Sequence, residues 1–293
     1  MDECSVVIPC RNRPRQVLDA VSSAVCLPFV SSVIVVDDAS VPKITVEHFS
    51  GIVNREKIRL ISNHLSAGAQ GARVAGVLEA TTDYVLFLDS DDVLHGPGVV
   101  ELHRRIVASG DIAMVYGNVV FGSKASDFLR LHGACFRPVL KNLSLCPFSG
   151  LLVRKAMVPW AMLDLSLPAW QDDDFVLCVC ERNRVAFVDV IAARMSSSAD
   201  SISRSSNRQL VGLSSLLGKW EQKIVREFGV GRLVLWRLRQ IGIVCLLIGE
   251  ELEQADRSSV LAAGAGRVLG YFASALGRGT QALVRPFFDR MYV

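Results

Sequence analysis

Short apolar runs rich in Val and Ile alternate with amphipathic segments over the first 125 residues, and this alternation constrains the fold more than any other feature. The apolar runs occupy residues 5–8, 32–36, 58–61, 84–88 and 112–120. Residues 15–25 and 69–80 carry Val, Leu and Ala at helical spacing. Strands that alternate with helices form βαβ units around a parallel sheet. We therefore expect an α/β fold with a Rossmann-like, mostly parallel sheet and flanking helices.

Polar residues follow the predicted strands at the points where the strands end. Arg11 and Arg13 come after the first strand, Asp37 and Asp38 after the second, and Asp89 directly after the fourth. Parallel strands present their carboxyl ends at one edge of the sheet, and open α/β sheets bind ligands at that edge. These side chains are therefore expected to converge on one crevice.

The acidic run that begins at Asp89 is the strongest chemical signal in the chain. Asp89, Asp91 and Asp92 place three carboxylates within four residues. A divalent cation would relieve their mutual repulsion, and oxygen ligands are those that Mg²⁺ or Mn²⁺ prefers. In enzymes such a cation also binds a substrate phosphate. A solvated turn or a helix N-cap is the alternative interpretation, because Asp is common at both.

Five blocks of sequence stand in order within about the first 200 residues. They read SVVIPCRNR at 5–13, VIVVDDAS at 33–40, GARVAG at 71–76, LDSDD at 88–92 and QDDD at 171–174. Together they resemble the motifs of the family 2 glycosyltransferases. That family has the GT-A fold and displaces a nucleotide diphosphate from a sugar with inversion of the anomeric centre.

The resemblance implies a role for each matching residue. Asp172 would be the catalytic base. Asp89 and Asp91 would hold Mn²⁺ or Mg²⁺, with Asp92 as a supporting or alternative ligand. The nucleotide sugar would contact seven residues: Pro9, Arg11, Asp38, Arg73, Asp89, Ser90 and Asp91.

The resemblance also implies substrates and a place in metabolism. The donor would be a nucleotide-diphosphate sugar, with a UDP-sugar favoured. The acceptor would be the hydroxyl of a saccharide or lipid-linked saccharide in surface polysaccharide or glycolipid assembly. These residue types suit the reaction, because a metal held by carboxylates stabilises a diphosphate leaving group and a further carboxylate can accept the acceptor's proton.

Three residues depart from the family pattern, and the choice of catalytic base is left open. Ala39 stands where the family has Gly, so the turn after the second strand lacks glycine's freedom at positive φ. Val74 replaces an Asn, which is expected to weaken any role of Arg73. Gln171 replaces a Glu, and the three consecutive Asp residues that follow leave the base open among them. The motif register favours Asp172.

Two other functions compete with the transferase. The segment from Asp89 also resembles the signature of haloacid-dehalogenase-type phosphatases, in which Asp89 would be the nucleophile and Asp91 the general acid. That signature normally lies on the first strand, whereas other strands precede it here. A nucleotide-sugar-binding protein without catalysis is the second alternative. Nicotinamide-dependent enzymes and P-loop proteins are disfavoured, because no G-x-G-x-x-G follows the first strand and no P-loop is present.

The chain is expected to divide into a catalytic domain over residues 1–200 and a helical, basic region over 201–293. The latter carries 13 Lys and Arg against 7 Asp and Glu. An apolar face at Leu213, Leu216 and Trp220 predicts a helix there. This region is either a cap on the catalytic domain or a contact with a membrane surface, given the Arg residues beside Trp236.

Cysteine usage and hydropathy bear on location. The eight cysteines show no zinc-type spacing, and no run reaches about 18 apolar residues, the length a membrane-spanning helix needs. With no secretory signal pattern at residues 1–9, these features favour a cytoplasmic protein, peripheral at the inner face of the membrane if the basic region binds lipid. No nucleic-acid partner is expected.

Overall fold

The computed structural model describes residues 2–65, 67–122, 124–125, 130–142, 146–196, 206–231 and 233–234. The chain divides into two compact units, Met1–Ala199 and Asp200–Val293. The first unit contains the sheet and its helices. The second contributes a long helix, α6 (Ser206–Phe228), to the described residues.

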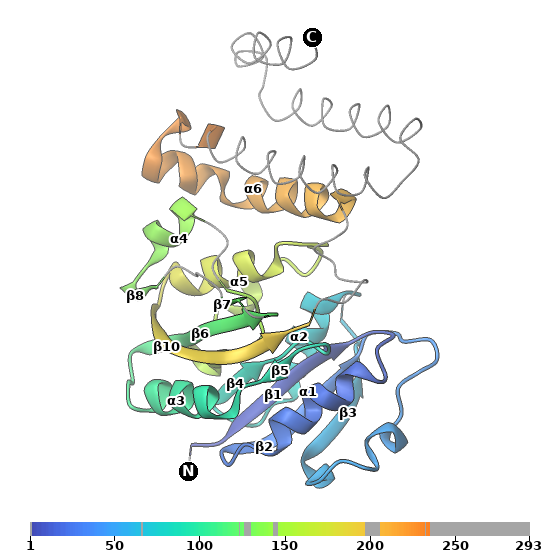
Figure 1. Cartoon of the computed structure of the whole chain (residues 1–293). Helices are drawn as coiled ribbons and strands as arrows, with labels where there is room; N and C mark the ends of the chain where they lie inside the picture. The colour runs from blue at the N-terminus through green and yellow to red at the C-terminus, as the bar shows by residue number, and fades with distance from the viewer. Residues whose placement is uncertain are drawn as a thin grey trace. The chain divides into compact units, whose positions relative to one another are not determined.

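The sheet of the first unit is mostly parallel, as expected, and the α/β fold is confirmed (Figure 1). Its strands follow the spatial order β3-β2-β1-β4-β9-β6-β10-β5, with β7 beside β6 and β8 beside β10. Strands β1 to β4 pair in parallel, and β9 then joins β4 and β6 in antiparallel pairing. The strand bounds are β1 (Cys4–Cys10), β2 (Val30–Asp37), β3 (Ile58–Ser62), β4 (Tyr84–Phe87), β5 (Val93–Leu94), β6 (Ile112–Phe121), β7 (Lys124–Ala125), β8 (His132–Ala134), β9 (Leu151–Arg154) and β10 (Arg184–Met195).

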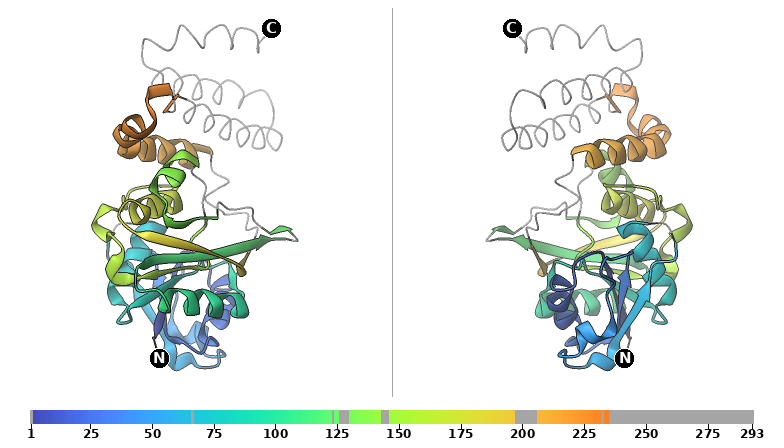
Figure 2. Two further views of the ribbon diagram at one scale, coloured as in Figure 1. Left: turned by 90° about the vertical axis from the view of Figure 1, so that its left-hand side faces the viewer. Right: turned by 90° about the vertical axis from the view of Figure 1, so that its right-hand side faces the viewer.

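Helices cover both faces of the sheet. Strand β1 shows why, because alternate side chains point to opposite faces: Val6 and Ile8 belong to a core that includes α1 (Gln16–Val25) and α3 (Gly96–Val107). Val7 points to the other face, toward α2 (Ala69–Glu79). Figure 2 shows α3 on one side of β6 and β10 and α5 (Gln171–Cys180) on the other.

The approach of α2 to the sheet depends on one glycine. A Cβ atom at Gly76 would lie 2.5 Å from Cγ1 of Val7, so a larger residue would push the helix away. The remaining helical segments are short: α4 (Phe136–Asn142) and the 3₁₀ turns η1 (Val46–Phe49), η2 (Arg55–Lys57), η3 (Lys155–Met157) and η4 (Trp160–Met162).

Most sequence-predicted elements of the first 125 residues are present with bounds shifted by one or two residues. Strand β9 was not predicted, because its four residues are too few to show a period. In the second unit the apolar face of α6 is confirmed, since Leu213, Leu216 and Trp220 are buried. The segment around Trp236 that was expected to contact membrane lies outside the described residues. Within the described part of the chain, no helix combines the length and the hydropathy needed to cross a bilayer.

Candidate functional site

The carboxyl ends of β1, β2 and β4 meet at one edge of the sheet. Cys10 pairs with Asp37 at the ends of β1 and β2, and the Asp38 amide donates to the Cys10 carbonyl over 2.8 Å. On the other side of β1, the Leu88 amide donates to the Val7 carbonyl over 3.1 Å. The loops after these strands therefore share one rim, as the order of polar residues predicts.

Asp38 is held at this rim by contacts from the loop after β3. Its Oδ1 accepts from the Asn63 side-chain amide over 2.7 Å, and its Oδ2 accepts from the Gly68 backbone amide over 2.9 Å. Nη1 of Arg11 lies 3.9 Å from Oδ2, on a side chain that is 58% exposed. Asp38 is thus a buried acceptor held by two donors, beside an exposed arginine. Asn63 is not among the predicted site residues, although it lies two residues after the third predicted strand.

The turn after Asp38 adopts the conformation that glycine would favour. Ala39 has φ 59°, in the left-handed region. The turn is retained because Ser40 Oγ accepts from the Asn12 amide over 2.8 Å and Asn12 Oδ1 accepts from the Val41 amide over 2.8 Å. Hydrogen bonds between the first two loops therefore hold an alanine in a strained backbone.

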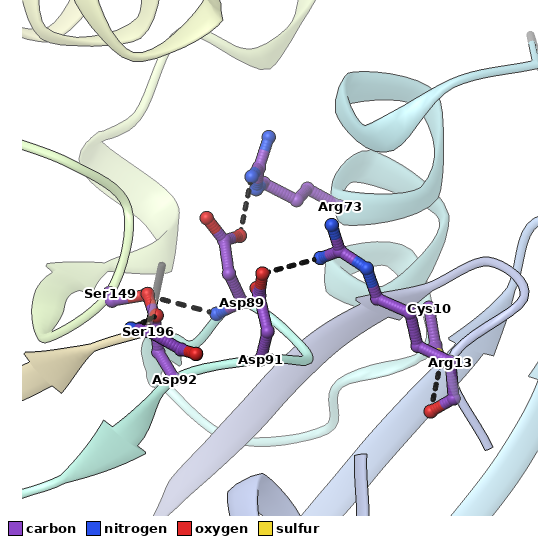
Figure 3. A network of polar contacts seen from close by, with 8 residues as sticks. All are labelled: Cys10, Arg13, Arg73, Asp89, Asp91, Asp92, Ser149 and Ser196. Atoms are coloured by element: carbon purple, nitrogen blue, oxygen red, sulfur yellow. Dashed lines mark hydrogen bonds and ion pairs between the residues drawn. The ribbon is translucent and has the colours of Figure 1, made fainter. Parts of the chain in front are cut away.

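Asp89 and Asp91 of the acidic run each meet an arginine from another element (Figure 3). Nη2 of Arg73, on α2, lies 2.6 Å from Oδ1 of Asp89. Nη1 of Arg13, in the loop after β1, lies 2.8 Å from Oδ2 of Asp91. Both carboxylates keep some exposure, so the run presents charged oxygens at the rim with cations alongside.

Asp92 turns away from the other two carboxylates. Its Oδ2 accepts from the Ser149 hydroxyl and its Oδ1 accepts from the Ser196 amide over 3.0 Å. Burial, together with the nearby Asp89 and Asp91 charges, raises the pKa of Asp92 to about 7. Figure 3 shows its side chain directed to Ser149 and Ser196, away from the two arginines.

Arg73 connects the acidic run to α5. Besides Asp89, its guanidinium donates from Nη1 to Oε1 of Gln171 over 3.1 Å and stacks 3.7 Å from the Phe148 ring centroid. Val74 does not prevent these contacts, and the expectation that it weakens the role of Arg73 in donor binding stays a prediction. The contacts of Arg73 come from its own side chain, which is buried among three segments, and do not depend on the residue after it.

The three Asp residues at the start of α5 have different surroundings. Asp174 is fully buried, and its Oδ2 accepts from the Asp164 amide over 3.1 Å. Asp173 is also buried. Asp172 is only half-buried, and it interacts electrostatically with Arg73 and Asp89. Burial raises the pKa of Asp172, because it disfavours the charged carboxylate.

Pro9 and Ser90 lie beneath the rim. Both are buried, Pro9 within β1 and Ser90 in the acidic run. A hydrogen bond joins Ser90 to the Cys10 thiol, whose pKa burial raises to about 11. Pro9 and Ser90 are thus enclosed, whereas the side chains of Arg11, Asp89 and Asp91 stay partly exposed.

The comparison with protein families decides the class of the chain. The model of glycosyl transferase family 2 matches residues 5–152. This range includes Asp37 and Asp38, the acidic run from Asp89 to Asp92, and Arg73. The chain belongs to this family. It is therefore a glycosyltransferase, and the resemblance seen in its motifs is confirmed.

Curated proteins similar to this chain are also glycosyltransferases by name. One is the UDP-Glc:alpha-D-GlcNAc-diphosphoundecaprenol beta-1,3-glucosyltransferase WfgD of Escherichia coli, 24% identical over 73% of this chain and 85% of the relative. Another is the amylovoran biosynthesis glycosyltransferase AmsB of Erwinia amylovora, 31% identical over 43% of this chain and 44% of the relative.

Solved structures agree with the fold of this family. S. aureus TarS residues 1–349 matches with a TM-score of 0.52 and 16% identity, over 92% of this chain and 89% of that chain. The same fragment in complex with UDP-GlcNAc matches with a TM-score of 0.54 and 14% identity over the same shares. At this identity the likeness establishes the fold, and the GT-A expectation is confirmed.

Family membership removes the phosphatase alternative for the acidic run. In the glycosyltransferase the run follows β4 in the middle of the sheet, with the loops after β1 and β2 on the same rim. If the chain were a phosphatase, Asp38 and Arg11 would have no functional role. The interpretation of Asp89 as a nucleophile is accordingly abandoned.

The run offers an incomplete set of metal ligands. Among the described residues, no group of three or more His, Cys, Asp or Glu side chains is arranged to hold a metal ion. Mg²⁺ typically takes one or two protein carboxylates and completes its shell with substrate phosphates and water. Asp89 and Asp91, both partly exposed, fit a cation of that kind. They do not fit a cage made by protein alone.

Proposed function

We propose that this glycosyltransferase moves a sugar from a nucleotide-diphosphate donor to a hydroxyl acceptor with inversion of the anomeric centre. One observation carries the proposal: Asp89 and Asp91, paired with Arg73 and Arg13, share a rim with the half-buried Asp172. The side chains that would bind the leaving diphosphate and the base that would accept the proton therefore lie on neighbouring elements.

Two kinds of charge at the rim suit a diphosphate. The Arg73 and Arg13 guanidinium groups are donors for phosphate oxygens, for which their planar geometry is well matched. When an anionic donor binds, these arginines can exchange a carboxylate for a phosphate without leaving the rim. Asp89 and Asp91 would then hold Mn²⁺ or Mg²⁺, with Asp92 the third carboxylate of the run. The cation would neutralise charge that develops on the departing diphosphate.

Asp38 is the candidate contact for the nucleotide base, with Pro9 and Arg11 at the wall of the pocket. Its carboxylate is buried and fixed by Asn63 and Gly68, so it is a pre-organised acceptor. A UDP-sugar is the favoured donor. The UDP-Glc in the name of WfgD and the UDP-GlcNAc complex of TarS support this choice.

Asp172 is the candidate general base. As the acceptor oxygen attacks the anomeric carbon, the bond from that carbon to the diphosphate oxygen breaks, and the acceptor proton passes to the Asp172 carboxylate. Asp174 is unsuited to this task, because its carboxylate is buried and supports the Asp164 amide. A positioned base of this kind contributes about 10²–10⁴ in rate.

A saccharide or lipid-linked saccharide is the favoured acceptor. The diphosphoundecaprenol in the name of WfgD and the amylovoran biosynthesis in the name of AmsB support this class. A lipid-linked acceptor would bring the enzyme to the inner face of a membrane as a peripheral protein.

Transfer is tested with radiolabelled UDP-glucose and UDP-GlcNAc, each with Mn²⁺, and a panel of free and undecaprenyl-linked saccharides. The proposal expects a labelled product with one of these donors, with inverted anomeric configuration by NMR. Asp172→Asn serves as the matched control with a strongly reduced rate. A protein that binds nucleotide sugar but neither transfers nor hydrolyses it would be a binding protein, the remaining alternative.

A further inference from the structure

Ser149 stands directly opposite Asp89 across two antiparallel segments. In the pairing of β4 with β9, Phe87 is the partner of Leu151. Two residues further along, the same register brings Asp89 to Ser149. The Asp89 amide donates to Ser149 Oγ over 3.1 Å, so the contact continues the ladder with a side chain in place of a carbonyl.

The Ser149 hydroxyl also reaches the other end of the acidic run. It donates to Oδ2 of Asp92 while it accepts from the Asp89 amide. One buried side chain therefore ties the first and last residues of the run together (Figure 3). This contact constrains the backbone between them, which carries Asp91.

The turn that carries Ser149 has little freedom to move. The Gly150 amide donates to the Phe87 carbonyl over 3.0 Å, and the Leu151 amide donates to the Phe148 carbonyl over 2.9 Å. Gly150 has φ 83°, and a Cβ atom there would lie 2.6 Å from Cβ of Ala192 on β10. Only glycine fits both the conformation and the space. Contacts of Gly150 with β4 and β10 therefore fix the position of the neighbouring Ser149.

A second tether holds Asp92 from the end of β10. The Ser196 amide donates to its Oδ1 over 3.0 Å, and β5 pairs Leu94 with Ala193 of β10. Both carboxylate oxygens of Asp92 are thus occupied by donors, and the residue is 2% exposed. Asp89 and Asp91 instead direct their carboxylates to arginines at the rim.

We propose that Ser149 is a positioning residue for the donor site. In this proposal Asp92 is the residue to which Ser149 is hydrogen-bonded, and Asp92 does not ligate the metal. Ser149 fixes the backbone of the acidic run so that Asp89 and Asp91 face the diphosphate. The inference about donor binding rests on the proposed function. The anchoring of the run does not.

The experiment compares Ser149→Ala with Ser149→Thr, which restores a hydroxyl, in the full-length protein. Ser31→Ala is the matched control, because Ser31 is a half-buried serine at the opposite end of β2 from the rim. Hydrogen exchange of unliganded protein is followed in peptides that span residues 88–95 and residues 30–37. Calorimetry then measures the affinity for uridine and for UDP with Mn²⁺.

Ser149→Ala is expected to speed exchange at residues 88–95 at least tenfold while residues 30–37 stay unchanged. UDP with Mn²⁺ is expected to bind about tenfold more weakly and uridine with unchanged affinity, with Ser149→Thr restoring both. Unchanged exchange at residues 88–95, or an equal loss for uridine and UDP, would overturn the proposal. If the unmodified protein binds no UDP, the proposed function fails, whereas the exchange result still decides the anchoring.

Discussion

Nη2 of Arg73 lies 2.6 Å from Oδ1 of Asp89, and the same guanidinium donates to Gln171, the residue before Asp172. One side chain on α2 thereby links the end of β4, where the leaving group would bind, to the start of α5, where the base would lie. The proposed leaving-group site and the proposed base therefore share one buried guanidinium group, that of Arg73.

Replacing Arg73 is expected to harm both activity and stability. Arg73→Lys keeps the charge but cannot contact Asp89 and Gln171 with two separate nitrogen donors in one plane. We expect kcat/KM to fall at least tenfold, and the free energy of unfolding to fall by about 1.5–3 kcal/mol, the range for hydrogen bonds to charged groups. Steady-state kinetics and urea unfolding measure the two effects. A lysine variant with unchanged kinetics would show that the link is dispensable.

The acids of α5 are expected to separate by function. Asp172→Asn should lower kcat by about 10²–10⁴ with little effect on stability, because Asp172 is half-buried and makes few structural contacts. Asp174→Ala should instead lower the free energy of unfolding by about 1–3 kcal/mol, since the Asp164 amide loses its buried acceptor. If Asp174→Asn loses activity as Asp172→Asn does while remaining equally stable, the choice of base is wrong.

The pH dependence of kcat follows from the direction of the Asp172 shift. A general base must be deprotonated, so the rate falls as pH falls through its pKa in the folded protein. Because burial raises the pKa of Asp172, the midpoint of this acidic limb should lie above the ordinary Asp value of about 3.9. The limb should be absent from the residual rate of Asp172→Asn. A midpoint below the ordinary value would assign the limb to another group.

Ala39→Gly is expected to stabilise the protein. A left-handed conformation costs an L-residue roughly 1–2 kcal/mol, and glycine's extra entropy in the unfolded state returns about 0.5–1 kcal/mol of that. We therefore expect a net gain of about 0.5–1 kcal/mol from the φ of 59° at Ala39. Urea unfolding measures it, with Ala39→Val as the opposite control. A loss of stability on Ala39→Gly would mean that the alanine methyl makes a favourable contact.

Much of the rim could be predicted from sequence because it depends on local order along the chain. Parallel strands place their ends together, so Arg11, Asp38 and Asp89 had to converge. Other features depend on pairing between distant segments. Ser149 is hydrogen-bonded to the acidic run because β9, which was not predicted, pairs antiparallel with β4. The sequence around Ser149 does not reveal the register of that pairing.

The separate surroundings of the acids were equally hidden. The motif gives Asp92 as a supporting or alternative ligand beside Asp89 and Asp91, but its contacts come from Ser149 and Ser196, far along the chain. Likewise, the burial of Asp174 depends on how α5 packs, and its sequence neighbours give no sign of it. The sequence shows how many Asp residues stand in a run, but tertiary packing determines which of them face the rim.

The most direct test of the central claim is calorimetric titration of UDP, with and without Mn²⁺, into the unmodified protein and Asp91→Asn. The account predicts that Mn²⁺ raises the affinity for UDP at least tenfold in the unmodified protein and that this gain disappears in Asp91→Asn, while uridine binds both alike. Failure of the unmodified protein to bind any nucleoside diphosphate, or an Mn²⁺ gain that survives Asp91→Asn, would contradict it.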